Sequence, residues 1–202
     1  MKKIVFVLLA FSISLSAQES VVDSLEIQNL EEVIVSSTRV KENIPIAFNN
    51  VSKEDISKRN LGQDIPILLN FLPNVVTTSD AGAGIGYTGI RIRGINSQSI
   101  NVTINGIPYN DAESLGTFWV DLPDFSSSVE NLQVQRGIGT SVNGSSAFGA
   151  SINILTDKIS QNPYFEAANT VGSFNTIKNN FRFSTGLLND TFEFSGRLSK
   201  ID

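Results

Sequence analysis

The sequence predicts an α+β domain, a small mixed sheet with short helices, followed by the first antiparallel strands of a transmembrane β-barrel. A segment with a helix cap and a segment with helical spacing of apolar residues come first, and from Gly89 onward apolar residues alternate with polar ones instead. After about Asn162 the alternation continues in longer segments. The chain has 202 residues, of which 41% are hydrophobic, so we expect one compact core with some additional material.

The absence of two residue types narrows the possible chemistry. The chain contains neither cysteine nor histidine, which excludes disulfides, thiolate nucleophiles, a Ser-His-Asp triad and metals held by Cys or His. Its net charge of −5 is not that of a nucleic-acid-binding protein. We therefore expect no catalytic residues, no metal, no cofactor and no nucleic-acid partner.

The N-terminus has the pattern of a secretory signal peptide. Two lysines precede the apolar run Ile4–Leu15, and small residues follow near Ala17, so residues 1–17 are expected to be removed on export. The run is shorter than the ~20 apolar residues of a membrane-spanning helix. In the polar segment that follows, residues 18–43, the apolar island Leu30–Ser37 is suited to adding itself to the sheet edge of another protein.

Two short helices are expected at the start of the globular part. Ser52 is a good N-cap for a helix within residues 52–60, which has acids in its first turn. Asp64 can cap a second helix that ends at Pro73. Its apolar residues recur at helical spacing: Ile65, Leu68, Leu69 and Leu72.

Alternation of apolar and polar residues predicts strands in the rest of this domain. The segments are residues 89–93, 100–104, 132–135 and 150–156. The pair Asn105-Gly106 directly follows the second segment and is the strongest short hairpin signal, so a β-hairpin is predicted there.

Three longer amphipathic segments end the chain. They are residues 164–174, 177–188 and 191–201, with turns at Gly172-Ser173 and Asn189-Asp190. In the last segment Phe192, Phe194 and Leu198 face one way and polar residues face the other. Length and alternation suit transmembrane β-strands with apolar residues outward and polar residues inward. A half-buried soluble sheet alternates in a similar way, so that alternative stays open.

Glycines near residue 85 have the spacing of a nucleotide-binding loop. Gly84, Gly86 and Gly89 form a G-x-G-x-x-G pattern, which in dinucleotide-binding folds opens a helix. Here a strand follows, so no helix N-terminus is available to a phosphate. A second stretch, Gly144–Ser151, has Ala150 where a phosphate-binding loop needs lysine. Both stretches are therefore interpreted as turns.

The ordered motifs resemble the plug domain of TonB-dependent outer-membrane receptors, between Leu30 and about Asp157. In chain order they are "EEVIVSSTR", "IPILLNFLPNV", "IRIRG", "VTINGIPYND", "VENLQVQRG" and "SSAFGASINILT". The resemblance implies an exported protein of the cell outer membrane with these parts: a signal peptide at 1–17, a flexible periplasmic segment at 18–43, a plug domain at 44–158 and incomplete barrel strands at 163–202.

The resemblance also implies contacts for two sets of residues. A TonB box, which pairs with the periplasmic partner TonB, is matched by Glu31, Glu32, Val33, Ile34, Val35 and Ser36. The arginines of the "RG" motifs contact barrel-wall glutamates in the family, and Arg93 and Arg136 match them. A buried strand-end arginine needs a carboxylate partner, which agrees with this role. Those partners are expected in barrel sequence beyond this chain.

Ligand contacts in the family come from outward loops of the plug. The matching stretches are residues 80–87, 96–99 and 109–119. Aromatic and amide side chains suit a bulky chelate or macrocycle. We therefore expect contacts from Tyr87, Gln98, Tyr109, Phe118 and Trp119, although Phe118 and Trp119 fit a role in the core at least as well.

The resulting hypothesis is the N-terminal part of an importer whose plug rearranges when TonB pulls on the box. Family barrels have about 22 strands, so three strands require further sequence or indicate a truncated gene. The end of the plug, and the absence of an extra domain before the box, differ from the sugar-importing branch. A ferric siderophore or other iron complex is therefore the expected ligand, and cobalamin or a glycan the alternative.

Two other classes of protein remain as rivals. In a stand-alone exported binding module, the last strands would complete a soluble sheet. In a glycosidase that uses only carboxylates, Asp111 and Glu113 would be the acid pair, but nothing in the sequence separates their pKa values, and solvated turn acids are the simpler interpretation.

Overall fold

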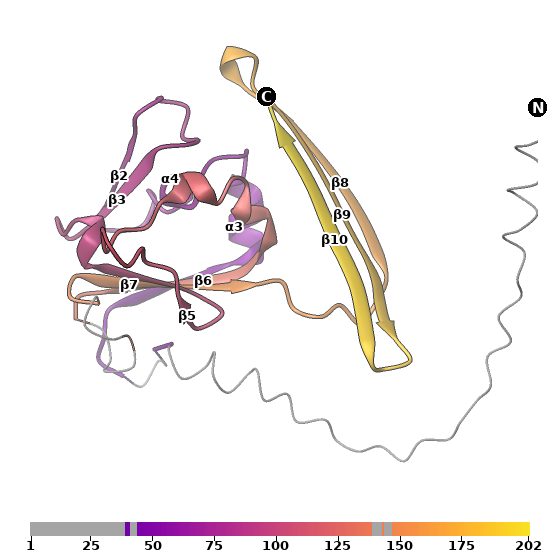
Figure 1. Cartoon of the computed structure of the whole chain (residues 1–202), viewed down its shortest axis with the longest axis horizontal. Helices are drawn as coiled ribbons and strands as arrows, with labels where there is room; N and C mark the ends of the chain where they lie inside the picture. Colours follow the sequence, from indigo (N-terminus) through magenta and orange to yellow (C-terminus); the bar gives the residue numbers. More distant parts are fainter. Residues whose placement is uncertain (1–38, 41–43, 139–142, 144–146) are drawn as a thin grey trace, which may run out of the picture.

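A computed structural model of the chain describes residues 39–40, 44–138, 143 and 147–202. The predicted signal peptide, residues 1–17, and the predicted TonB box, residues 31–36, lie outside this description. The described part contains a five-stranded sheet, a three-stranded sheet and a two-stranded hairpin, with short helices between them (Figure 1). No helix in these ranges is long and apolar enough to cross a membrane.

The first helix forms where its cap predicts it. α3, Lys53–Arg59, begins after Ser52, whose hydroxyl oxygen accepts a hydrogen bond from the backbone N–H of Asp55 at 3.2 Å. Acids lie in its first turn and bases in its last turn, which complements the helix dipole. Ile56 is the residue that the helix buries in the core. The predicted helix at residues 52–60 is confirmed.

The second helix is shorter than predicted, and its predicted N-cap residue makes no side-chain bond to it. α4, Ile65–Leu68, is a single turn, because beyond it the backbone N–H groups bond three residues back, as Leu72 does to Leu69. Asp64 precedes the helix but gives it no side-chain hydrogen bond. The apolar residues chosen by periodicity are nonetheless all buried. Periodicity therefore identified the buried face correctly but placed the end of the helix too late.

The five-stranded sheet has the order β1-β6-β7-β4-β5. Only β4 and β7 pair in parallel, and all other neighbours are antiparallel. The strands are β1 Phe48–Ser52, β4 Ile100–Ile104, β5 Ile107–Pro108, β6 Val129–Arg136 and β7 Ala150–Thr156. The predicted mixed sheet is thus confirmed, with β1 as an additional edge strand.

The turn between β4 and β5 has the predicted conformation. Asn105 and Gly106 both have positive φ values, 50° and 82°, as the two central residues of a type I′ turn require. The Asn105 side chain also holds the turn to the neighbouring strand, since its Oδ1 accepts from the backbone N–H of Thr156 at 3.0 Å. The hairpin signal in the sequence therefore specified both the turn and its register.

A separate hairpin extends away from the five-stranded sheet. Its strands, β2 Val75–Ser79 and β3 Thr88–Ile92, pair antiparallel across the loop at residues 80–87 (Figure 1). β3 was predicted, whereas β2 was not. The core lies between one face of the five-stranded sheet and the layer formed by the helices and this hairpin. Its fully buried members include Leu69, Ile92, Ile152 and Val134.

The last three strands form their own sheet, which we call the wall sheet. Its strands are β8 Tyr164–Val171, β9 Ile177–Leu188 and β10 Phe192–Ile201, in the order β10-β9-β8. Both predicted turns are present, and Asn189 and Asp190 adopt positive φ at the second one. The wall sheet stands beside the rest of the domain rather than continuing its five-stranded sheet (Figure 1).

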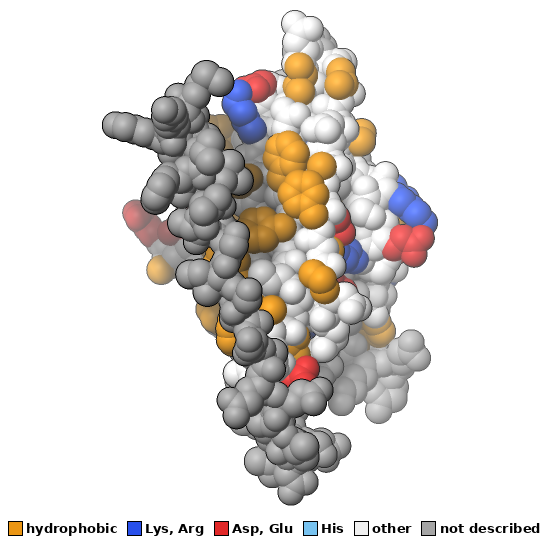
Figure 2. Space-filling model, turned by 90° about the vertical axis from the view of Figure 1, so that its right-hand side faces the viewer, with side chains coloured by type: hydrophobic (Ala, Val, Ile, Leu, Met, Phe, Trp, Pro, Cys, Tyr) orange, Lys and Arg blue, Asp and Glu red, His pale blue; other side chains and the backbone are white. Residues whose placement is uncertain are grey.

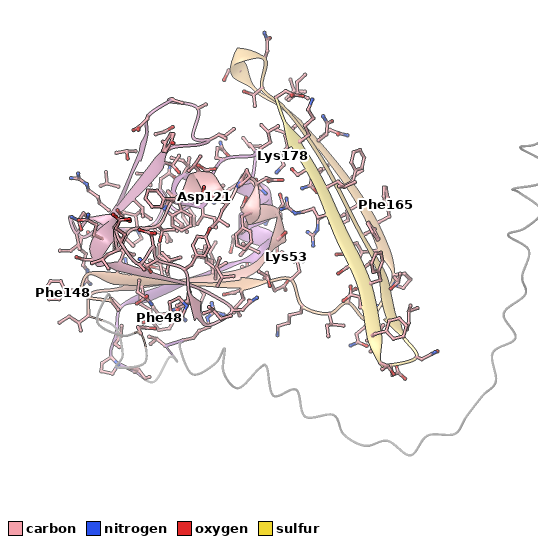
Figure 3. All side chains as sticks on the ribbon, in the orientation of Figure 1. Phe48, Lys53, Asp121, Phe148, Phe165 and Lys178 are labelled. Carbon is pink, nitrogen blue, oxygen red and sulfur yellow. The ribbon has the colours of Figure 1, made fainter. Side chains whose placement is uncertain are left out.

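The two faces of the wall sheet differ sharply in chemistry. The side toward the domain is polar, and Lys178, Asn180 and Ser184 are buried there. The outer side carries exposed aromatic and aliphatic side chains that gather into a patch (Figure 2). They include Phe165, Phe181, Phe183, Phe194 and Leu198. Figure 3 shows Phe165 on the outer side and Lys178 toward the domain.

Candidate ligand-facing loops and contacts between the domain and the wall sheet

The glycine-rich loop of the β2–β3 hairpin owes its glycines to backbone geometry. Gly84 has a φ of +77°, and a Cβ atom there would lie 3.1 Å from Cγ of Gln63 and 3.3 Å from Cγ1 of Ile67. Only glycine combines this backbone conformation with so close an approach. The loop connects two paired strands, so the interpretation as a turn between strands is confirmed.

Asp64 attaches this loop to the start of α4. Its backbone N–H donates to the carbonyl of Gly84 at 2.9 Å, and its carboxylate accepts from the Thr88 hydroxyl at 2.8 Å. Burial raises the pKa of Asp64, although the hydrogen bonds from Thr88 and from the Gly86 N–H act in the opposite direction. Asp64 therefore occupies the predicted N-cap position, but its side chain does not cap the helix. The carboxylate turns toward the loop instead, because the partly buried Thr88 hydroxyl donates to it there.

A pocket of about 240 Å³ opens between the hairpin loop and the segment around residue 118. Three of the five predicted ligand residues, Tyr87, Phe118 and Trp119, line it. Tyr87 is 68% exposed and Phe118 49%, whereas Trp119 is 2% exposed and also belongs to the core. The hydroxyl of Thr117 and Nε1 of Trp119 are buried and have no hydrogen-bond partner among the described residues. The pocket thus combines aromatic walls with polar side chains, since Thr78, Asp80 and Thr88 also line it.

The other two predicted ligand residues do not line this pocket. Gln98 is exposed in the 3₁₀ turn Ser97–Ser99 and accepts a long hydrogen bond from Asn96. Tyr109 is half-buried and packs against the core. All five ligand assignments remain predictions.

The acid pair considered for a glycosidase forms a turn instead. The carboxylate of Asp111 accepts hydrogen bonds from the backbone N–H groups of Ser114 at 2.6 Å and Glu113 at 3.2 Å. The bond from Ser114 lowers the pKa of Asp111, which keeps this exposed acid ionised. An ionised turn carboxylate does not suit the general acid of glycoside hydrolysis.

The two arginines expected to bind the barrel lie close to each other. Nη1 of Arg93 is 3.0 Å from the position that a Cβ atom would occupy on Gly137, the residue next to Arg136. Nη1 of Arg136 donates to the carbonyl of Pro73 at 3.2 Å. Within the described ranges neither arginine forms an ion pair. Their binding to barrel glutamates stays a prediction.

The structure shows a different set of contacts to the wall sheet, which the sequence did not reveal. Asp124, just before β6, is 2% exposed and receives donors from both β9 and β10. We call the following residues the Asp124 cluster: Asp124, Ser127, Lys178, Asn180, Arg197 and Ser199. The partners lie 54 to 75 positions away from Asp124, apart from Ser127. No local pattern marks them.

Burial alone would raise the pKa of Asp124. The hydrogen bonds from Lys178, Ser199 and Ser127 outweigh burial, so the pKa lies below its ordinary value. A second contact joins Arg182 to Asp157 at 2.6 Å, and Asp157 also binds Lys53 at 2.7 Å. Both contacts place the acid on the domain and a cation on the wall sheet. The contacts expected for Arg93 and Arg136 have the reverse arrangement of charge.

The family can be assigned from these features together. A family model described as the TonB-dependent receptor plug domain matches residues 40–151, which is more than half of the chain. The chain therefore belongs to the TonB-dependent receptor plug domain family. This family is one of receptors and transporters rather than of enzymes.

Curated relatives match most of this chain but only a small part of their own length. The vitamin B12 transporter BtuB of Vibrio vulnificus is 29% identical over 185 residues, which are 90% of this chain and 29% of the relative. The probable TonB-dependent siderophore receptor PirA of Acinetobacter baumannii is 25% identical over 154 residues, or 71% and 20% of the two chains. The present chain thus spans less than a third of each relative.

Solved structures share the fold at low identity. The ferric yersiniabactin uptake receptor FyuA of Yersinia pestis superposes with a TM-score of 0.57 at 19% identity, covering 76% of this chain and 24% of FyuA. FpvA of P. aeruginosa, bound to a heterologous pyoverdine, gives 0.61 at 16% identity, with 79% and 20% covered. These likenesses concern the fold, and they confirm the predicted plug domain followed by the first barrel strands.

Proposed function

We propose that this chain is the N-terminal part of a TonB-dependent outer-membrane receptor that imports an iron complex such as a ferric siderophore. The observation that carries the proposal is the seating of a plug domain against the polar side of the wall sheet. The opposite side of that sheet is apolar and exposed. Polar groups toward the lumen and apolar groups toward lipid are the arrangement of an outer-membrane barrel that contains a plug.

The same observation argues against a stand-alone soluble module. In such a module the last strands would complete the sheet of the domain and bury their apolar side. Instead they form a separate sheet whose aromatic side has no covering element among the described residues. Exposed apolar patches of this kind mark contact with a membrane or a partner. Lipid of the outer membrane is the proposed contact.

The ligand assignment rests on the outward loops and on the names of relatives. Tyr87, Phe118 and Trp119 meet in one pocket, and aromatic walls interspersed with polar side chains suit a bulky chelate. PirA and FyuA are described as receptors for a siderophore and for ferric yersiniabactin. Cobalamin is the second candidate, because the relative that covers 90% of this chain is described as a vitamin B12 transporter.

The mechanism that we propose is rearrangement of the plug under force from TonB. The segment at residues 18–43 would present the box at residues 31–36 to the periplasmic domain of TonB as an added strand. Arg93 and Arg136 would bind glutamates elsewhere on the barrel. The proposed division of the chain keeps residues 1–17 as signal peptide, 44–158 as plug and 163–202 as barrel strands.

Uptake measurements on the complete receptor test this proposal. The receptor would be expressed in a host that lacks its own iron-chelate and cobalamin receptors, and uptake of radioactive ferric siderophores and of cobalamin would be compared. We expect energy-dependent uptake of an iron complex that is lost when residues 31–36 are deleted. Uptake of cobalamin alone would replace the iron assignment with the second candidate. Uptake that survives the deletion would contradict the role of the box.

A further inference from the structure

The carboxylate of Asp124 joins the plug to two strands of the wall sheet. Its Oδ1 accepts from Nζ of Lys178 at 2.5 Å, and its Oδ2 accepts from Nδ2 of Asn180 and Nη1 of Arg197, both at 3.0 Å. The Ser199 hydroxyl donates to the same Oδ2. Arg197 also donates to the backbone carbonyl of Asp124 at 3.0 Å. Four side chains of the wall sheet therefore converge on one residue of the plug.

The ammonium group of Lys178 has all of its described hydrogen-bond partners on the plug. An ammonium group has three donors. In this structure they reach Asp124, Asn60 at 3.2 Å and the Ser127 hydroxyl at 3.1 Å, and all three residues belong to the plug. The side chain of Lys178 is 4% exposed. If the plug moved away, the ammonium would lose every described partner at once.

This contact is more deeply buried than the second one between plug and wall. In the second contact the side chain of Asp157 is 27% exposed and that of its wall partner Arg182 12%, whereas those of Asp124 and Lys178 are 2% and 4% exposed. Exposed ion pairs contribute little, but removing one partner of a buried pair is strongly destabilising because the other charge stays unpaired. The Asp124 cluster is therefore expected to dominate the attachment of the plug to these strands.

We propose that the Asp124 cluster is a lock that holds the plug closed against the barrel wall in the resting receptor. The lock places its acid on the plug and its cations on the wall, and it is separate from the contacts predicted for Arg93 and Arg136. The lock depends on the proposed function in one respect, namely that a barrel encloses the plug. The identity of the ligand does not enter.

The test measures leakage through the complete receptor in the absence of ligand. Host cells expressing the receptor are exposed to vancomycin, which an intact outer membrane excludes. For Asp124→Asn we expect passive entry to rise by about a hundredfold or more, since a buried Lys178 without its counter-charge shifts the plug strongly toward the open state. Asp121→Asn is the matched control, because Asp121 is exposed and its side chain has no hydrogen bond or ion pair within the described part. It is expected to stay closed.

Charge compensation separates a lock from a general packing effect. The double variant Asp124→Asn with Lys178→Met removes both members of the buried pair, so it is expected to leak less than Asp124→Asn alone. Arg197→Gln leaves Asp124 with Lys178 and is expected to leak least. The heat-dependent gel mobility of the barrel and its surface abundance verify assembly of each variant. An assembled Asp124→Asn receptor as tight as the parent overturns the proposal.

If Asp124→Asn does not assemble, Arg197→Gln and the double variant decide the question by the same measurement. Arg197→Gln keeps the Asp124–Lys178 pair, and the double variant removes it. Equal leakage from these two variants contradicts an electrostatic lock. Leakage requires neither ligand nor TonB. The two proposals can therefore fail separately. A wrong lock shows in vancomycin entry, whereas a wrong importer assignment shows in the uptake measurements and leaves vancomycin entry unchanged.

Discussion

Individual residues in this protein are constrained either by backbone geometry or by buried charge. Gly84 and Asp124 represent the two cases. The first sits at positive φ where another segment approaches within 3.1 Å, and the second holds a buried carboxylate at a φ of 50° among cationic and polar partners. Both residues belong to segments that connect helices and strands. In such segments a single residue often has a specific conformational or binding role.

Alanine substitutions at two glycines separate backbone strain from crowding. Gly82 has a φ of +75° and free space around its Cβ position, whereas Gly84 has nearly the same φ and close neighbours. Left-handed backbone costs an alanine about 1 kcal/mol in either case. Gly84→Ala is expected to cost about 1–3 kcal/mol more, because Gln63 and Ile67 must move. Hydrogen exchange of residues 80–87 in the receptor measures this. Equal loss of protection in both variants would contradict the role of crowding.

The pH dependence of the lock follows from the lowered pKa of Asp124. A carboxyl group whose pKa is lower in the folded protein stabilises it above the ordinary pKa, about 3.9 for aspartate, and this stabilisation is lost as pH falls through the folded value. The parent receptor should therefore stay closed to vancomycin-sized solutes at neutral and mildly acidic pH. Proteoliposome leakage measured from pH 7 downward checks this. An opening that begins near pH 6 would be inconsistent with the paired carboxylate.

At the scale of elements, the wall sheet is the most distinctive part of the chain. Its three strands alternate so consistently that one side is a polar surface against the plug and the other an aromatic patch (Figure 2). The polar side is where Lys178 and Arg197 meet Asp124. The plug sheet, in contrast, packs one face against its helices through apolar residues.

A charge on the aromatic side of the wall sheet should impair insertion into lipid. Leu198 is 72% exposed on that side. Leu198→Arg is expected to destabilise the inserted barrel by about 2–4 kcal/mol if the residue lies near the bilayer midplane. Lys200→Arg, two residues further along the same side, is the matched control and is expected to have little effect. Folding of the complete receptor into lipid vesicles, followed by gel mobility, provides the measurement. Unimpaired insertion of Leu198→Arg would argue against lipid contact.

For the whole molecule, the relation between plug and wall sheet decides how the chain behaves in solution. In the described structure β8 and β10 are the edges of a three-stranded sheet, and unpaired strand edges promote association. The hydrophobic core of the plug is formed by plug residues alone. The wall sheet meets the plug through the polar contacts described above. The two parts should therefore differ in solubility.

Two lengths of the chain test this difference. Residues 18–158 are expected to be monomeric without detergent, because the plug core is complete within them. Residues 18–202 are expected to associate or to require detergent, because the aromatic side and both edges of the wall sheet are uncovered. Light scattering in buffer with and without detergent distinguishes the two. A monomeric 18–202 chain without detergent, with β8–β10 protected from exchange, would favour the soluble module.

Local features of the sequence determined most of the elements. The Ser52 cap, the Asn105-Gly106 turn and the alternation in residues 164–201 each act over a few residues, so their outcome is present in the sequence itself. The same holds for the glycine pattern, because the strand after it already excluded a phosphate site. The end of α4 was predicted too late, since an apolar period cannot distinguish an α-helix from the i→i+3 turns that replaced it.

Only the tertiary structure decided which polar groups meet. Asp64 was expected to cap a helix, but folding brings Thr88 to its carboxylate. Asp124 was not predicted to have any role, and its partners Lys178 and Arg197 lie 54 and 73 positions away. The physical reason is that helices, turns and strands depend on short-range backbone geometry, whereas a buried ion pair depends on how whole elements pack. For this protein, the sequence determined the plug and its strands, and packing decided how the plug is held to its wall.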